Sequence, residues 1–198
     1  MKHVLIAILL IVSLGAAAQP GRRLEKLGTN DTIPAGQAAF YGQFIQRLKK
    51  FKSGGYPQDI RLINIETNEV FVFRVKSTFK TSKENQFCYL IEPGTYVILN
   101  YWWTESKWYG GKSYMEPIYK GEDSIFETER KIKNKKQRPD ELVFFKFTVA
   151  ENTLNYLGTW HFEDSPVFFT NDKEETDKEM QDKYKKLDFP ASHIAIPD

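Results

Sequence analysis

Short β-rich runs, separated by turn-forming residues, fill most of the chain and constrain its fold more than any other feature. Residues 59–65 and 70–75 are rich in Ile, Leu, Val and Phe, and a short polar link joins them. In the second run Phe71, Phe73 and Val75 alternate with other residues and therefore share one face of a strand. Two such runs with a link of turn length predict a β-hairpin.

A second hairpin is predicted where residues 87–91 and 96–103 flank the sequence EPGT at positions 92–95. Proline presets φ at the second turn position and glycine supplies a positive φ at the third, which is type II turn chemistry. The run 96–103 is apolar on both faces. One face is expected to join the core, so the other must be covered by a helix, a loop or a partner.

A third hairpin is predicted from the alternating runs 143–149 and 154–162, with Asn152 at a left-handed turn position between them. The short run 167–169 is expected to close the sheet. Residues 38–46 are ambiguous, because their aromatic residues fit both helical spacing and strand alternation. We favour a first strand there.

One helix is predicted near the C-terminus, over residues 172–187. Asn171 followed by Glu174 resembles a capping box, and acidic and basic residues are paired at i,i+4 spacing along the segment. A narrow apolar stripe predicts a surface helix that lies along one edge of the body; the stripe consists of Met180, Tyr184 and Leu187.

These elements predict a mainly β fold, specifically an Ig-like or transthyretin-like antiparallel β-sandwich of about seven strands with one C-terminal surface helix. An aromatic content of 15% suits such a core. The expected organisation is a signal peptide (1–18), a flexible lead-in (19–36), a single domain (37–190) with a long insertion (104–141), and a tail (191–198). About 180 residues after the leader are enough for one sizeable core.

The first eighteen residues predict export. Lys2 and His3 precede an apolar run over residues 4–12, and the stretch ends in three alanines, the pattern that signal peptidase recognises. The run is shorter than the roughly 20 residues of a spanning helix. Cleavage after Ala18 would leave Gln19, where a lipid anchor would need a cysteine. We therefore expect a soluble product in the periplasm or outside the cell, with no transmembrane segment.

Two stretches resemble a known kind of domain. Residues 90–97 resemble the apolar, Pro-Gly-x-Tyr hairpin of small transthyretin-like or carboxypeptidase-regulatory-like β-sandwiches. Residues 147–149 followed by 155–158 resemble the Val and Tyr-Leu-Gly hairpin found downstream in many uncharacterised secreted bacterial domains of that kind. The resemblance implies a fold and brings no catalytic residues with it.

Charge and side-chain content argue against several functional classes. The 28 Lys and Arg nearly balance the 26 Asp and Glu, which argues against a nucleic-acid binder. The single cysteine, Cys88, lies in an apolar run and is expected to be a small buried residue. After leader removal only His161 and His193 remain, and His161 with Glu163 is too few ligands for zinc. We expect His161 at a solvated sheet edge, His193 exposed, no catalytic or metal site, and no cofactor.

The segment 104–141 is the most promising candidate for function. No core element is recognised in it, and loops longer than about 12–15 residues are usually functional or disordered. Its basic run, 130–138, is expected to be a solvated loop, with attraction to polyanions as the alternative. The candidate ligand- or partner-binding residues are aromatic: Trp102, Trp103, Trp108, Tyr109 and Tyr114.

Three roles are open for these aromatic residues: covering the preceding strand, anchoring a protein interface, or stacking on sugars. We therefore predict a secreted, non-enzymatic β-sandwich that binds a protein of the cell envelope. A glycan-binding module is the alternative, and a hydrolase of unknown type is the third hypothesis. The sequence leaves the ligand, the biological process and the oligomeric state open.

Overall fold

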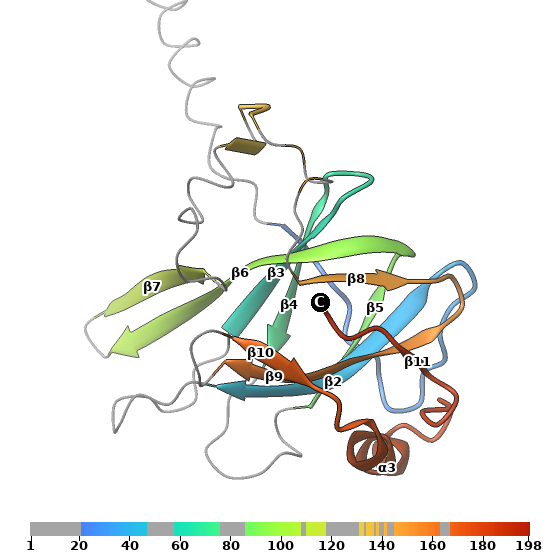
Figure 1. The fold of residues 1–198 in the computed structure, drawn as a ribbon. Helices are drawn as coiled ribbons and strands as arrows, with labels where there is room; N and C mark the ends of the chain where they lie inside the picture. The colour runs from blue at the N-terminus through green and yellow to red at the C-terminus, as the bar shows by residue number, and fades with distance from the viewer. Residues whose placement is uncertain are drawn as a thin grey trace, which may run out of the picture.

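The computed structural model describes residues 21–46, 58–75, 86–107, 110–117, 131–132, 134–136, 138, 141, 145–162 and 167–198. These residues form two β-sheets that pack face to face, with the helix α3 (Lys173–Lys183) against the second sheet (Figure 1). The mainly β fold predicted from the sequence is confirmed. The predicted signal peptide, 1–18, lies outside the described residues.

The first sheet has six strands in the order β1-β4-β3-β6-β7, with β8 also paired to β6. The second has five, in the order β10-β9-β2-β5, with β11 also paired to β9. The strands of the first sheet are β1 (Arg22–Arg23), β3 (Gln58–Asn64), β4 (Val70–Val75), β6 (Gly94–Lys107), β7 (Gly110–Pro117) and β8 (Lys146–Val149). Those of the second are β2 (Ala38–Gln46), β5 (Gln86–Ile91), β9 (Leu154–Phe162), β10 (Phe168–Thr170) and β11 (His193–Ile194).

Both sheets are mixed, whereas the sequence predicted antiparallel sheets. Strand β2 runs parallel to β9 at the centre of the second sheet, and β1 runs parallel to β4 in the first. The described strands are also more numerous than the predicted seven or so. Strands β1 and β11 have two residues each and no hydrophobic alternation to reveal them, and β7 lies in the segment expected to be an insertion. Residues 38–46 form a strand, as predicted.

Two of the three predicted hairpins are connections between the sheets instead. Strand β5 belongs to the five-stranded sheet and β6 to the six-stranded sheet, so the chain crosses the sandwich at residues 92–93. The same is true of β8 and β9, on either side of Asn152. Asn152 adopts the predicted left-handed conformation, with a φ of 60°, but the φ of 149° at Gly94 is not the value of about 80° that the predicted type II turn requires. Only the hairpin of β3 and β4 is confirmed, with Ile60 opposite Phe73.

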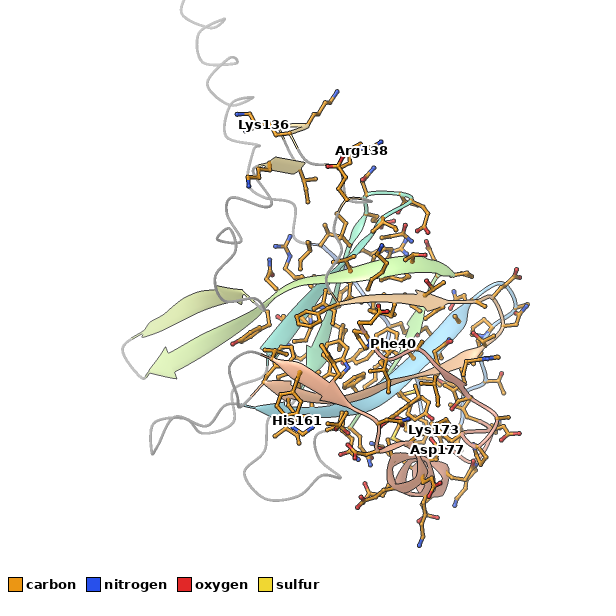
Figure 2. All side chains as sticks on the ribbon, viewed as in Figure 1. Phe40, Lys136, Arg138, His161, Lys173 and Asp177 are labelled. Carbon is orange, nitrogen blue, oxygen red and sulfur yellow. The ribbon has the colours of Figure 1, made fainter. Side chains whose placement is uncertain are left out.

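An aromatic core fills the space between the sheets (Figure 2). Phe40 from β2 meets Phe73 from β4 edge-to-face, with ring centroids 5.2 Å apart, and Phe73 meets Trp160 from β9 at 5.7 Å. Such pairs contribute about 0.5–1.5 kcal/mol each beyond the area that they bury. Since every one of these contacts joins opposite sheets, the aromatic residues hold the two layers together.

A bulge at Gly158 changes the face that β9 presents. Gly158 has a φ of 84°, and the register between β2 and β9 shifts beside it. Before the bulge Tyr156 packs in the cluster under α3, and after it Trp160 packs in the core between the sheets. The prediction that residues 154–162 alternate without interruption is therefore wrong, because a bulge adds one residue to the count.

The other face of the five-stranded sheet is covered by α3 and the segment after it. The predicted stripe residues are buried, with Met180 0% and Tyr184 2% exposed, and they pack on Tyr41 and Cys88. The helix therefore lies across a sheet face, not along an edge. Cys88 is buried as predicted, and burial raises the pKa of its thiol to about 12.

The ends of α3 differ from the prediction. The helix stops at Lys183 with Tyr184 as its C-cap, four residues before the predicted end at 187. Its N-cap is Asp172, so the expected capping box from Asn171 to Glu174 does not form. The Asn171 side chain instead accepts a hydrogen bond from the backbone N–H of Lys173, at 3.3 Å.

The outer face of β6 is covered from within the chain. Val97 and Leu99 form a small cluster with Ile63, and Ile132 packs against it. Ile132 belongs to the basic run that the sequence predicted to be a solvated loop, while Lys135 and Lys136 in the same run are exposed. A loop of the insertion thus provides cover for this part of the strand.

Three segments expected to be irregular contain regular structure. Strand β6 continues to Lys107 and pairs with β7, so residues 104–117 of the predicted insertion are largely strand. In the predicted lead-in, Leu27 donates its backbone N–H to Cys88 at 3.1 Å, and β1 pairs with β4. In the predicted tail, β11 pairs with β9, and the backbone N–H of Lys146 bonds to Asp198.

The bulge at Gly158 provides the first test of this fold. A Cβ at Gly158 would lie 2.8 Å from the backbone oxygen of Thr170, whereas at Gly36, which has a similar φ of 80°, its nearest contact is 3.9 Å away. Urea unfolding of Gly158→Ala should show a loss of at least about 3 kcal/mol, against about 1 kcal/mol for the matched Gly36→Ala. Equal losses would mean that positive φ alone matters.

Tyr96 provides a second test, at alkaline pH. Its hydroxyl donates to the backbone oxygen of Glu92 at 2.8 Å, and burial raises the pKa of Tyr96 to about 12. The unfolded chain releases this proton near pH 10, so the free energy of unfolding should fall as pH rises from about 10 to 12. For Tyr96→Phe, the free energy of unfolding measured with urea should fall less steeply with pH than for the unchanged protein. By pH 11 its loss should be smaller by about 1 kcal/mol. Parallel pH profiles would contradict this.

Candidate functional site

The predicted aromatic site residues lie on and around the pair β6 and β7. The pairing of β6 with β3 ends at Trp103, and β6 continues with β7 alone until Lys107 stands opposite Gly110. Figure 1 shows this two-stranded ribbon extending away from the sandwich. Trp108 and Tyr109 lie outside the described residues, as do the side chains of Trp102, Trp103 and Tyr114.

The strand register determines which of these positions can act together. Trp103 is paired with Tyr114, and Trp102 is paired with Met115. Directly paired residues of an antiparallel ribbon have Cβ atoms about 4.5–5.5 Å apart and share a face. Successive residues alternate between faces. Positions 103 and 114 therefore form one aromatic pair, and position 102 belongs to the opposite face of the ribbon.

A charged pair lies at the base of the ribbon, where Asp59 is the register partner of Trp102. The Arg74 guanidinium donates to both carboxylate oxygens of Asp59, at 2.8 and 2.9 Å. Burial by itself would raise the pKa of Asp59, but the hydrogen bonds and charge of Arg74, with help from Arg23, hold it below its ordinary value. The carboxylate therefore stays ionised and paired.

A buried polar cluster lies between α3 and the second sheet. The Asp177 carboxylate accepts hydrogen bonds from the Tyr41 hydroxyl and from Lys173 Nζ. Tyr41 is also 2.7 Å from Ser192 Oγ, and Lys173 donates to the Phe189 backbone oxygen at 2.9 Å. Figure 2 shows Lys173 and Asp177 together on α3. The cluster ties the helix to β2 and to the segment after the helix.

Burial and the hydrogen bond to Asp177 raise the pKa of Tyr41 above its ordinary value. The phenol is therefore a neutral hydrogen-bond donor. Tyr41 is 0% exposed and Asp177 7% exposed, so little of this cluster is open to solvent. The arrangement suits a structural cross-link, in which each charged group has a partner inside the protein.

His161 lies in a second polar chain, on the same face of the sheet. His161 Nε2 is 2.9 Å from Thr170 Oγ1, and Thr170 donates to Asp172 Oδ2 at 2.6 Å. The imidazole stacks on the Phe168 ring with centroids 4.3 Å apart. The expected sheet edge is wrong for His161, because β10 covers that side of β9. His193 is exposed, as predicted.

The described residues contain neither a metal-ligand cluster nor a membrane-spanning helix. Among the described residues, no group of three or more His, Cys, Asp or Glu side chains is placed to hold a metal ion. Glu163, which the sequence places near His161, lies outside those residues. Within the same part of the chain, no helix has both the length and the hydropathy that crossing a membrane requires.

The sequence analysis missed the polar clusters. One local signal was available, because Lys173 and Asp177 are separated by four residues in a predicted helix and form an ion pair there. The partners of Asp177 on β2 and after α3 had no such signal. Tyr41 is 136 positions away from Asp177, and only the packing of α3 on the sheet brings the two together.

Comparison with known proteins adds little. No family model matches the chain, and no curated protein matches it. Among solved structures, a leucine-rich repeat protein from Bacteroides thetaiotaomicron is similar over 65% of this chain and 14% of that one, with 14% sequence identity and a TM-score of 0.32. That TM-score is too low to indicate a shared fold.

The polar cluster under α3 makes a testable contribution to stability. Asp177→Ala would leave the largely buried Lys173 ammonium without its carboxylate partner and remove one hydrogen bond of Tyr41, so we expect a loss of about 3 kcal/mol. The matched change on the same helix, Asp182→Ala, removes an exposed carboxylate and should cost less than about 0.5 kcal/mol. Urea unfolding measures both.

The double variant Lys173→Met/Asp177→Leu separates burial from pairing. It removes both charges together, so it should be more stable than Asp177→Ala alone. If Asp177→Ala and Asp182→Ala unfold at the same urea concentration, the cluster is not a cross-link.

Proposed function

We propose that this chain is exported and works as a non-enzymatic binding module, which engages a protein of the cell envelope through the ribbon of β6 and β7. The export step rests on the leader pattern of residues 1–18. The binding role rests on one observation above others: the register of the ribbon pairs Trp103 with Tyr114, at the point where β6 leaves β3.

Aromatic pairs of this kind suit protein recognition. Trp and Tyr are enriched among the residues that dominate binding energy, because they bury a large area at a small cost in conformational entropy. The two strands fix the spacing of positions 103 and 114 before any partner binds. A pre-formed pair loses less conformational freedom on binding than a flexible loop would.

The place of β7 in the sheet supports the same role. Strand β7 spans Gly110–Pro117 and stands last in the strand order of its sheet, within the described part of the chain. A strand at the end of a sheet can accept an extended segment of another protein through main-chain hydrogen bonds. Side chains at alternate positions would then give specificity.

Glycan binding is the alternative use of the same residues. A sugar ring would stack on Trp103 or Tyr114, so both hypotheses predict that these two positions matter. The protein hypothesis additionally uses the main chain of β7, which a sugar does not need. Parallel assays on one set of variants can therefore distinguish the two.

The test uses the mature chain from Gln19, immobilised and exposed to an envelope extract. Trp103→Ala/Tyr114→Ala should weaken capture of the bound protein at least about thirtyfold, the equivalent of one strong anchor. The control Asp182→Ala removes an exposed side chain from α3, on the other sheet, and should leave this capture unchanged. Urea unfolding of each variant checks that the fold is intact.

A glycan array with tryptophan fluorescence is run on the same three proteins. A glycan signal that the ribbon variant abolishes would replace the protein hypothesis with the glycan hypothesis. Capture that is equal for all three proteins would contradict any binding role for the ribbon.

A further inference from the structure

Within the described part of the chain, a strip of the second sheet beside the start of α3 lies at the edge of the sheet. Strands β10 and β11 both pair with β9 on the side away from β2, one after the other along it. Strand β10 stands at the end of the strand order. This strip, defined here as β10, β11 and residues 171–175, belongs to the opposite sheet from the ribbon of β6 and β7.

The exposed apolar side chains of the described residues gather on this strip. Phe168 on β10 is 41% exposed, and Ile194 on β11 is 59% exposed. The Phe168 ring lies flat on the imidazole of His161, with 3° between the planes. His161 is itself held by Thr170, so the exposed ring has a fixed support.

Beside these side chains lies a hollow of about 440 Å³, lined by residues 171–175 and Ile194. Its charged lining is mainly acidic. Within the described residues, the exposed carboxylates of Glu174 and Glu175 have no ion-pair partner, and the Asp172 carboxylate accepts a hydrogen bond from the Thr170 hydroxyl. The one lysine in the lining, Lys173, is paired with Asp177 and cannot neutralise them.

We propose that this strip is a docking site for an extended, basic segment of a partner protein. The segment adds to β10 as a further strand and places apolar side chains against Phe168 and Ile194. A Lys or Arg of the segment enters the hollow, near Glu174 and Glu175. Negative potential from unpaired carboxylates selects a cationic partner and repels an acidic one.

The layout of the strip favours an extended segment over a folded surface. The hollow is lined by residues 171–175, which follow β10, and by Ile194 of β11, so one segment along this edge contacts both apolar and acidic groups. Strand β10 has only three residues, so main-chain bonds alone give little affinity and the side-chain anchors must provide the rest.

The experiment uses an array of ten-residue peptides in which alternate positions carry Lys, Glu or Ser and the others carry Val or Phe. The fluorescently labelled mature chain should be retained by the Lys-containing peptides and not by their Glu counterparts. Retention should weaken as salt is raised from 50 to 500 mM, because exposed charge pairs are screened.

Variants test the residues. Glu174→Gln/Glu175→Gln should weaken binding of Lys peptides about five- to twentyfold, and Phe168→Ser should weaken it for peptides with either charge pattern. Asp182→Asn removes a carboxylate from the far end of the same helix and should change binding less than twofold. Trp103→Ala/Tyr114→Ala should leave binding unchanged, which separates this site from the proposed ribbon site.

Several outcomes would overturn the proposal. These are no retention of any peptide, equal retention of Lys and Glu peptides, or retention that Glu174→Gln/Glu175→Gln does not reduce. Light scattering of the same samples tests one further outcome, in which the strip binds a second copy of this chain. If Phe168→Ser converts a dimer to a monomer, the strip is an interface between copies of this chain.

Discussion

The bulge at Gly158 allows one strand to supply two apolar clusters on opposite faces of the same sheet. Leu154 and Tyr156 pack under α3, while Trp160 and Phe162 pack between the sheets. Without the extra residue, strict alternation would put Tyr156 and Trp160 on one face, and one of the two clusters would lose its large side chains from β9. The sandwich core, the docking of α3 and the polar groups under the helix all depend on this change of face.

Residues that favour a turn do not determine whether the two flanking strands pair with each other, and in this chain two of three such pairs of strands belong to different sheets. Asn152 takes the left-handed turn conformation that its sequence predicts, whereas the φ of 149° at Gly94 differs from the value of about 80° of the predicted type II turn. Which strand pairs with which depends on inward-facing side chains far apart in sequence, such as Phe40 and Phe73. A local pattern holds no information on such contacts, so a crossing between layers and a hairpin look alike in sequence. The β3 and β4 hairpin was predictable because both strands bury the same face.

The candidate sites show the same limit: the sequence identifies the residues, but contacts between distant segments determine which of them lie together. The aromatic residues around position 103 were found from composition alone, but their grouping was not. Register pairs Trp103 with Tyr114 and puts position 102 on the other face, a fact that only strand pairing determines. The acidic strip beside α3 was even harder to predict from the sequence. It combines residues of β10, β11 and the first turn of the helix, and its exposed Ile194 lies in a segment that reads as an irregular tail.

The edges of the two sheets connect the architecture to both proposed surfaces. Exposed strand edges invite pairing with other chains, and proteins protect them with charge or with covering segments. At the β1 edge of the first sheet lie two arginines, of which Arg22 forms ion pairs with Glu69 and Glu92. At the β5 edge of the second sheet, residues 25–27 cover the strand through backbone hydrogen bonds. Among the described strands, β7 and β10 remain at the other ends of their sheets. The aromatic ribbon lies at β7, and the acidic, apolar strip lies at β10. The chain thus covers one edge of each sheet with its own residues, and the two proposed binding surfaces lie at the other two edges.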